Sequence, residues 1–275
     1  MNRLLLLKHY LAGRSNGVRA HEIAMRLFRL PAKNRAMKKI SDCKPDGDNL
    51  RVSFHNIESP LYWPKHLDLS QLYQVTAEVF YHDDWHFYEW KHTCVAIDDV
   101  VVDCGAAEGL FGLTVAHRCK EVYAIEPLPL FHSSMLATFA EKNNVQIIPV
   151  ALSNKVSTAV IAEQGIYSPV DDENCLSSDG VPVQVTTIDE LFWAKQIPIT
   201  YIKADLEGHE LKMLEGARKT LAAYRPKIAI TTYHREDHAG QIIDFLRSLN
   251  IDYKIKLKGI DHIWGVPVML HAWTG

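Results

Sequence analysis

The sequence lacks the features that mark membrane-spanning, disulfide-stabilised and zinc-binding proteins. No apolar run approaches the roughly 20 residues that a transmembrane helix needs, and no small-residue cleavage site follows the leucine run at 4–7. The five cysteines, at positions 43, 94, 104, 119 and 175, are odd in number and include no C-x-x-C pair. This distribution argues against a disulfide framework or a zinc site. We therefore expect a cytoplasmic protein with free thiols and no integral membrane segment.

An excess of charge of one sign is absent overall but present locally. The formal net charge is −3, so the chain as a whole offers no basic surface for nucleic acid. Residues 1–44 nevertheless contain eleven lysines and arginines against only two acidic residues. Ile23, Leu27 and Leu30 recur there at helical spacing. The segment predicts a basic amphipathic arm that packs on the rest of the chain or on a second subunit, which leaves a homo-oligomer open. Contact with an anionic surface is a further alternative.

The dinucleotide fingerprint G-x-G-x-x-G is absent as well. Residues 100–104 form a β-branched run typical of a strand buried on both faces, followed by a glycine turn and a helix pattern. This arrangement favours a nucleotide site, because glycine lets the backbone approach a ligand and the helix N-terminus offers unpaired N–H groups. The glycines fall at 105, 109 and 112, and Ala107 occupies the position of the second fingerprint glycine. The spacing thus argues against an NAD-linked enzyme.

Strand and helix patterns alternate from residue 100 to the end of the sequence. We predict seven strands, at 100–104, 121–126, 145–152, 201–205, 227–233, 253–257 and 266–271. Helix patterns lie at 110–118, 130–141, 189–195, 210–224 and 238–249, with Asp189 capping the third, and residues 156–188 form an inserted hairpin. The predicted fold class is α/β: a Rossmann-like sheet of seven mostly parallel strands with an antiparallel terminal hairpin, preceded by an N-terminal extension.

The N-terminal extension, residues 1–92, differs in character from the predicted domain at 93–275. A turn at 45–49 precedes an alternating strand pattern at 50–57. Residues 61–92 are rich in aromatic side chains and histidine. We expect them to form a cap over the carboxyl end of the sheet, where substrates are commonly selected.

His82 and His86 have a spacing that would place two histidines on one helix face, with Asp83 and Asp84 between them. No third ligand follows at a recognisable spacing. We therefore expect a solvated polar face at residues 82–86 and no metal site.

Four further motifs accompany the glycine motif D-x-G-x-x-x-G at 103–109. They are E-P at 126–127, A-L-S at 151–153, T-I-D at 187–189 and D-x-E-G-x-E at 205–210. In this order they resemble the FkbM family of S-adenosylmethionine (SAM)-dependent methyltransferases over about residues 95–250. Glu108 stands where the family usually has Asn, and Ala204 where it often has Val. The resemblance implies a Rossmann-like methyltransferase fold, SAM as the cofactor, and a small hydroxylated acceptor, methylated on a hydroxyl of a sugar or secondary metabolite.

The cofactor residues are expected at the carboxyl ends of the strands, which converge on one crevice in this fold. Glu126 lies 21 residues past Gly105, and an acid about 20 residues past the first glycine typically accepts hydrogen bonds from the ribose hydroxyls. Asp103 could reach the ammonium group of SAM through water, and Pro127 and Leu152 are candidates for the adenine slot. The predicted cofactor-binding residues are Asp103, Gly105, Ala106, Glu108, Gly109, Glu126, Pro127, Ala151 and Leu152.

Transfer of a methyl group to a hydroxyl also requires a proton acceptor, and we predict three catalytic residues: Asp205, Glu207 and His234. Residues two apart in an extended segment point the same way, so the two carboxylates would share a cavity and their repulsion would raise one pKa. His234 ends a strand and has an ordinary pKa of about 6.5. His209 begins a helix, and we expect it to face solvent.

Two alternatives stay open from the sequence. One is another nucleotide-binding Rossmann enzyme, such as an NAD-linked one. The other is a scaffold that keeps the methyltransferase fold without turnover.

Overall fold

The computed structural model describes residues 3–162, 170–171 and 180–275. Cys175 and the tip of the inserted hairpin lie outside these ranges. Within them, the four other cysteines are free thiols. No helix in these ranges is both long and apolar enough to cross a membrane.

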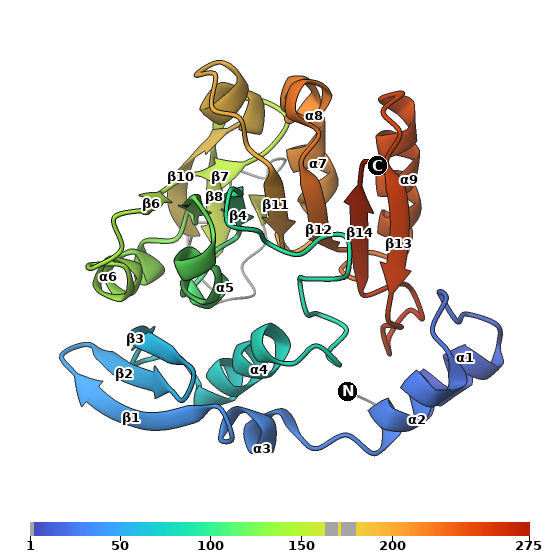
Figure 1. Cartoon of the computed structure of the whole chain (residues 1–275), viewed down its shortest axis with the longest axis horizontal. Coiled ribbons are helices and arrows are strands. Elements are labelled where there is room, and N and C mark those ends of the chain that lie inside the picture. Colours follow the sequence, from blue (N-terminus) through green and yellow to red (C-terminus); the bar gives the residue numbers. More distant parts are fainter. Residues whose placement is uncertain (1–2, 163–169, 172–179) are drawn as a thin grey trace.

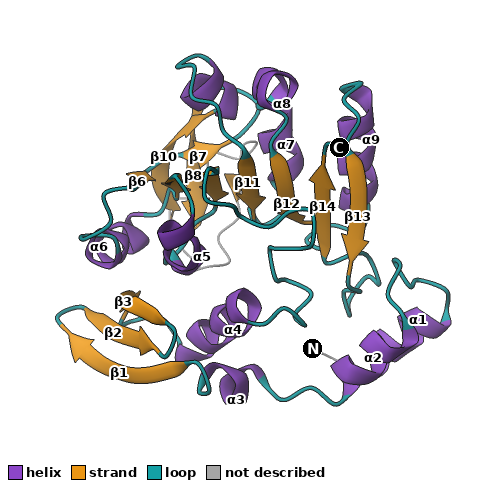
Figure 2. Cartoon of the chain, viewed as in Figure 1, coloured by secondary structure: helices purple, strands orange, loops and turns teal. Residues whose placement is uncertain are grey.

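The central feature is a seven-stranded sheet in the order β13-β14-β12-β11-β4-β5-β6 (Figure 2). Five neighbouring strands run parallel: β4 (Val100–Cys104), β5 (Glu121–Ile125), β6 (Val145–Ile148), β11 (Tyr201–Ala204) and β12 (Lys227–Thr231). At one edge β14 (Met269–Trp273) pairs antiparallel with both β12 and β13 (Lys254–Lys258). The predicted fold class, a mostly parallel seven-stranded sheet closed by an antiparallel hairpin, is confirmed.

Helices cover both faces of the sheet, which explains why β4 is buried along its whole length. Val102 packs in a core with residues of α7 (Glu210–Glu215), α8 (Arg218–Tyr224) and α9 (His238–Ser248). Val101, one position earlier, points to the other face and packs with α5 (Leu110–Val115) and the N-terminal segment. Helix α6 (Pro129–Thr138) follows β5 on that side (Figure 1).

The predicted strand at 145–152 is wrong as a single element. Pro149 has no N–H group to continue the ladder, and the chain leaves the central sheet after Ile148. It resumes as β7 (Ala151–Leu152), which pairs with β10 (Gly180–Thr186) in a second sheet of order β7-β10-β8-β9. The other members of that sheet are β8 (Ser157–Ala162) and β9 (Val170–Asp171), and the antiparallel pairing of β8 with β10 confirms the inserted hairpin.

The predicted helix at 210–224 is also divided in two. Gly216 sits between α7 and α8, and a Cβ there would lie 2.2 Å from the backbone oxygen of Ser153. We expected Asp189 to cap its own helical turn (Asp189–Trp193). This is wrong, because Ile188 is the N-cap of that turn. The carboxylate of Asp189 instead accepts hydrogen bonds from the backbone N–H groups of Lys219 and Thr220, at 3.0 and 2.8 Å. It therefore caps the start of α8.

The N-terminal part contains more regular structure than the sequence indicated. Three helices, α1 (Arg3–Leu11), α2 (Ala20–Leu27) and α3 (Ala32–Ala36), precede an antiparallel sheet. The sheet consists of β1 (Ile40–Asp46), β2 (Asn49–Phe54) and β3 (Ile57–Pro64), and α4 (Leu69–Phe80) follows it. The single predicted strand at 50–57 missed β1, which is polar and mostly exposed, and β3, which contains Pro60. These elements lie below the central sheet in Figure 1 and share its core.

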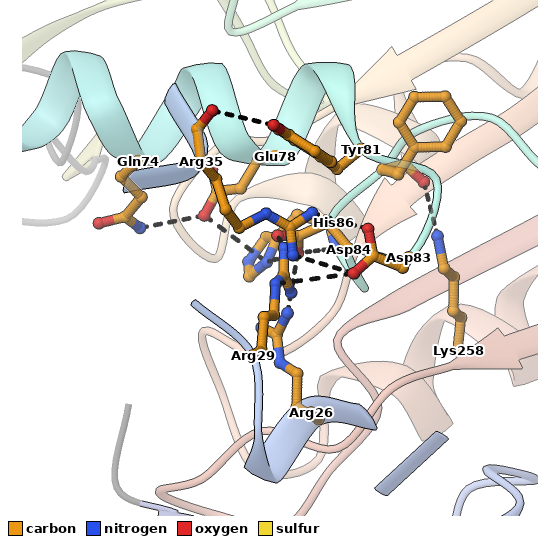
Figure 3. A network of polar contacts seen from close by, with 11 residues as sticks. Arg26, Arg29, Arg35, Gln74, Glu78, Tyr81, Asp83, Asp84, His86 and Lys258 are labelled. Atoms are coloured by element: carbon orange, nitrogen blue, oxygen red, sulfur yellow. Dashed lines mark hydrogen bonds and ion pairs between the residues drawn. The ribbon is translucent and has the colours of Figure 1, made fainter. Parts of the chain in front are cut away.

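The basic arm packs on its own chain, one of the two packing modes that we expected. Arg26, Arg29 and Arg35 pair with the carboxylates of Asp83 and Asp84 (Figure 3). Asp84 is buried, and so is its neighbour Trp85. The expectation of a solvated polar face at residues 82–86 is therefore wrong for Asp84, which arginines from the arm cover, whereas His82 and Asp83 are exposed as expected.

Replacement of Asp189 by Ala is expected to lower the free energy of unfolding by about 1–2 kcal/mol, since it removes the cap of α8. Chemical denaturation monitored by circular dichroism measures this. Glu190→Ala serves as the control, because Glu190 is exposed and adjacent. Equal midpoints for the two variants would show that the cap contributes no stability.

Candidate active site

Loops that follow three parallel strands meet at the carboxyl edge of the sheet. They are the glycine loop after β4 (residues 105–109), the loop after β11 with Asp205 and Glu207, and the loop after β12 with Tyr233 and His234. Together with α4 they enclose a cavity of about 70 Å³, here called the strand-end cavity. Asp205, Glu207 and Tyr233 line it, as do four residues of α4. Helix α4, from the segment expected to form a cap, thus contributes to the wall of this cavity.

The glycine loop is held tightly by the protein itself. Gly105 has a φ of +73°, and a Cβ there would lie 2.1 Å from the backbone oxygen of Asp205. The N–H groups of Gly105 and Ala106 both donate to the carbonyl of Ile125 at 3.0 Å. Glycine is thus required at 105 by the approach of another loop, not only by a ligand as the sequence suggested. Gly109, with a φ of +86°, is the N-cap of α5.

Glu126 connects the glycine loop to the loop after β5. One carboxylate oxygen accepts from the N–H of Ala107 and the other from the N–H of Leu128, both at 2.9 Å. Burial raises the pKa of Glu126 to about 7, although these hydrogen bonds oppose the shift. Each oxygen keeps a lone pair for a further hydrogen bond, but Glu126 is not among the described residues that line the strand-end cavity. Glu108, which lines the cavity, is buried too, and burial raises its pKa to about 7.

Asp103 does not line the strand-end cavity. It is fully buried beneath Lys203, whose Nζ lies 2.9 Å from Asp103 Oδ1 and donates to the carbonyl of Gly105 at 2.7 Å. Burial lowers the pKa of Lys203, but Asp103 and Asp205 outweigh it and raise the pKa above its ordinary value. Lys203 therefore stays charged and separates Asp103 from the cavity.

Pro127 and Leu152, the two candidates for the adenine slot, also lie away from this cavity, as does Ala151, the other predicted cofactor-binding residue there. Ala151 and Leu152 are buried in β7, in the second sheet, and Pro127 is half-buried. None of the three is among the described residues that line the strand-end cavity.

Asp205, Glu207 and His234 are brought together as the sequence predicted. His234 Nε2 lies 3.3 Å from Glu207 Oε2 and 3.6 Å from Asp205 Oδ1, while Nδ1 lies 3.1 Å from Glu210 Oε1. The reason we gave for pairing the carboxylates is wrong, because Glu207 has a φ of +52° and is not extended. The turn nevertheless places Glu207 beside Asp205 at the cavity.

The protonation of this cluster differs from the expectation. Burial opposes the charge of His234, but Glu207, Glu210 and Asp205 raise its pKa to about 11. Burial likewise opposes the charge of Glu210, yet His234 lowers its pKa to about 2. For Glu207, burial raises the pKa by more than His234 lowers it. His234 is thus an imidazolium near neutral pH and has no vacant nitrogen to accept a proton.

His209 is buried, not exposed as expected, and its Nε2 lies 3.1 Å from the hydroxyl of Ser153. His209 directly precedes Glu210, which contacts His234 and is fully buried, so His209 lies in the same buried segment.

Sequence reasoning missed Lys203, Tyr88 and Tyr233, all of which line the cavity. The hydroxyl of Tyr88 donates to Asp205 Oδ2 at 2.7 Å, and its ring lies 5.0 Å from Lys203 Nζ. A lysine inside an otherwise apolar strand was a usable signal for Lys203, because a buried ammonium requires a partner. Tyr88 had no such signal, since it is one of many aromatic residues in the cap.

Comparisons with known proteins identify the family of the chain. The model of the methyltransferase FkbM domain matches residues 103–254, more than half of the chain. The chain therefore belongs to the FkbM family of SAM-dependent methyltransferases. The comparison with curated proteins gives no match.

Two solved structures illustrate the likeness. The FkbM methyltransferase from Methylobacillus flagellatus KT is 19% identical, with a TM-score of 0.50 over 94% of this chain and 63% of that one. The chain thus spans under two thirds of that protein. TYW2 from M. jannaschii, in complex with AdoMet, is 14% identical, with a TM-score of 0.43 over 83% of this chain and 85% of that one.

Gly105→Ala is expected to lower both stability and SAM affinity, because the new Cβ would collide with the backbone of Asp205. Gly240→Ala is the matched control: Gly240 lies in α9 with no atom within 4 Å of the added Cβ, so it should be neutral or stabilising. Thermal unfolding and calorimetric titration with SAM measure the two effects. A Gly105→Ala variant as stable as Gly240→Ala would contradict the close approach.

The contribution of charged His234 to stability is expected to be complete below about pH 6.5 and to fall as the pH rises towards 11, because its pKa is higher in the folded chain than in the unfolded one. For one titrating proton, the free energy of unfolding changes by at most about 1.4 kcal/mol per pH unit. The stability difference between the wild type and His234→Gln should therefore shrink between pH 7 and pH 10 in urea denaturation. Exposed His117→Gln should show no such trend. A constant difference for His234→Gln would refute the raised pKa.

Proposed function

We propose that this protein is an O-methyltransferase that methylates a hydroxyl group of a small acceptor, such as a sugar or secondary metabolite. The carboxylate pair Asp205 and Glu207 at the strand-end cavity is the observation that carries the proposal. A hydroxyl loses its proton on methylation, so the site needs an acceptor for that proton. SAM, when bound, supplies the methyl group on its sulfonium sulfur.

In this proposal Glu207 accepts the proton. Its carboxyl has a pKa raised by burial, and a base works best when its pKa is near the working pH. Asp205 already accepts hydrogen bonds on both oxygens, from Tyr88 and from the hydroxyl of Thr231, at 2.7 and 3.0 Å. We therefore propose that Asp205 orients the acceptor and does not take its proton. The imidazolium of His234 holds both carboxylates in place, and α4 excludes water.

The cofactor assignment rests on the loops after β4 and β5. Glu126 would hold the ribose, since its carboxylate has unused lone pairs beside the glycine loop. Residues 93–275 would form the methyltransferase domain, and residues 1–92 the arm and cap that contact the acceptor. The scaffold alternative remains the second candidate, because Asp103 and the loop N–H groups are engaged within the protein.

Two variants separate the two roles. Glu207→Gln is expected to reduce turnover by about 10²-fold or more, the usual scale for loss of a general base, with SAM affinity within a few-fold. Glu126→Gln is expected to weaken SAM binding by about 10- to 100-fold, because charge-assisted hydrogen bonds to the ribose are lost. Exposed Glu141→Gln is the control for both.

Calorimetry measures SAM binding, and release of S-adenosylhomocysteine (SAH) over a panel of hydroxylated sugars and metabolites measures turnover. If the Glu207→Gln variant turns over as fast as the wild type, Glu207 is not the base. SAM binding by the wild type without turnover of any hydroxylated acceptor would favour the scaffold.

A further inference from the structure

A second cavity, of about 500 Å³, adjoins the strand-end cavity beneath the N-terminal arm. Gln74, Glu78 and Tyr233 line both. The ring of Tyr233 lies 4.2 Å from that of His234 on one side and 4.9 Å from that of His86 on the other. Four arginines line the second cavity: Arg3, Arg26, Arg29 and Arg35. We call it the arginine cavity.

The arginine side chains are fixed by the protein. Those of Arg26, Arg29 and Arg35 are only 13%, 10% and 6% exposed. Arg26 and Arg29 both contact the buried Asp84, and Arg35 donates two hydrogen bonds to Asp83, at 2.9 and 2.7 Å (Figure 3). A group held in one orientation before binding loses little entropy when a ligand arrives.

The donors of these arginines are not all used. Arg26 Nε, Arg29 Nη1 and Arg35 Nε are buried and have no hydrogen-bond partner in the described part of the chain. Buried guanidinium groups with unmet donors are unfavourable unless an acceptor satisfies them.

Three carboxylates line the same cavity, and all are engaged: Asp84 pairs with Arg26 and Arg29, and the other two accept hydrogen bonds from other groups. Glu78 accepts from Gln74 at 3.1 Å, and Asp261 accepts from the N–H groups of Ile263 and Trp264 at 2.8 Å. The unmet hydrogen-bonding capacity is therefore mainly that of donors on cationic side chains.

We propose that the arginine cavity binds an oxyanion, a carboxylate or a phosphate, of the methyl acceptor, while the acceptor's hydroxyl reaches Asp205 and Glu207 past Tyr233. The inference rests on the proposed function and names its substrate class. Guanidinium groups match both oxyanions because their N–H groups form a planar fork. The basic arm, whose function the sequence left open, then forms part of the acceptor site.

The test uses the chain of residues 1–275 saturated with SAH, whose affinity is measured first. Matched probes are then titrated calorimetrically: glucuronate and glucose 6-phosphate against glucose, and 4-hydroxybenzoate against 4-hydroxybenzyl alcohol. The anionic member of at least one set is expected to bind about 10-fold or more tightly, the scale of one charge-assisted hydrogen bond. The ranking of glucuronate and glucose 6-phosphate distinguishes carboxylate from phosphate.

Arg29→Gln should remove this preference by weakening the binding of the anionic probe about 10- to 100-fold. The affinity for SAH should not change. Arg3→Gln should weaken it in the same direction, and it is the safer variant because Arg3 is exposed and contacts only the carbonyl of Arg29 among the described hydrogen bonds. Arg19→Gln is the control, since Arg19 is 74% exposed and does not line the cavity.

Equal affinities for charged and neutral probes, or a preference that survives in both Arg29→Gln and Arg3→Gln, would overturn the proposal and leave the arginines with the single role of fastening the arm. Failure of the wild type to bind SAH would instead refute the proposed function.

Discussion

The site depends on one buried cation. Lys203 extends from the middle of the sheet, contacts the carboxylate of Asp103 and the carbonyl of Gly105, and lies against the ring of Tyr88. It thereby joins β11, the glycine loop and the N-terminal cap. An unpaired ammonium at this depth would cost several kcal/mol. The position of Lys203 and the positions of its three partners therefore depend on one another. The approach of Gly105 to the backbone of Asp205 follows from this arrangement, as does the orientation of Tyr88 towards Asp205.

Charge balance in the neighbouring cluster is equally constrained. Three carboxylates, of Asp205, Glu207 and Glu210, surround the single imidazolium of His234. Glu210 is fully buried and holds its negative charge because His234 is next to it. The excess of negative charge suits a site that would receive a cationic sulfonium and a proton. The same carboxylates raise the pKa of His234, which disfavours this histidine as the base.

Local sequence patterns predicted most strands of the central sheet, because each buried strand is marked by its own short run of apolar residues. The β-branched run at β4 and the alternation of strands and helices predicted the strands of the sheet, whereas their order in the sheet was not predicted. Failures occurred where a tertiary contact decided the outcome. Gly216 divides a helix because Ser153 approaches it, and Asp189 caps a helix about 30 residues away. Pro149 was a local signal that we did not use.

The same distinction applies to the site. The carboxylates were found from motifs, since their positions at strand ends follow from the fold. The state of His234 was not predictable, because its pKa depends on side chains from another loop and helix. The burial of Asp84 and the contact of Tyr88 with Asp205 depend on how a segment distant in sequence folds back, and no spacing in the chain encodes that.

The small volume of the strand-end cavity has a kinetic consequence. Ligand pockets usually enclose about 300–1,000 Å³, whereas this cavity encloses about 70 Å³. A nucleoside cofactor bound in this cavity would need more room than the cavity offers, and a shift of α4 away from the glycine loop would provide it. Helix α4 packs on α3, and α3 is fastened through Arg35 to Asp83. If α4 has to move for the cofactor to bind, the ion pairs of the arm would resist that movement, although they lie about 70 residues away from the glycine loop in sequence.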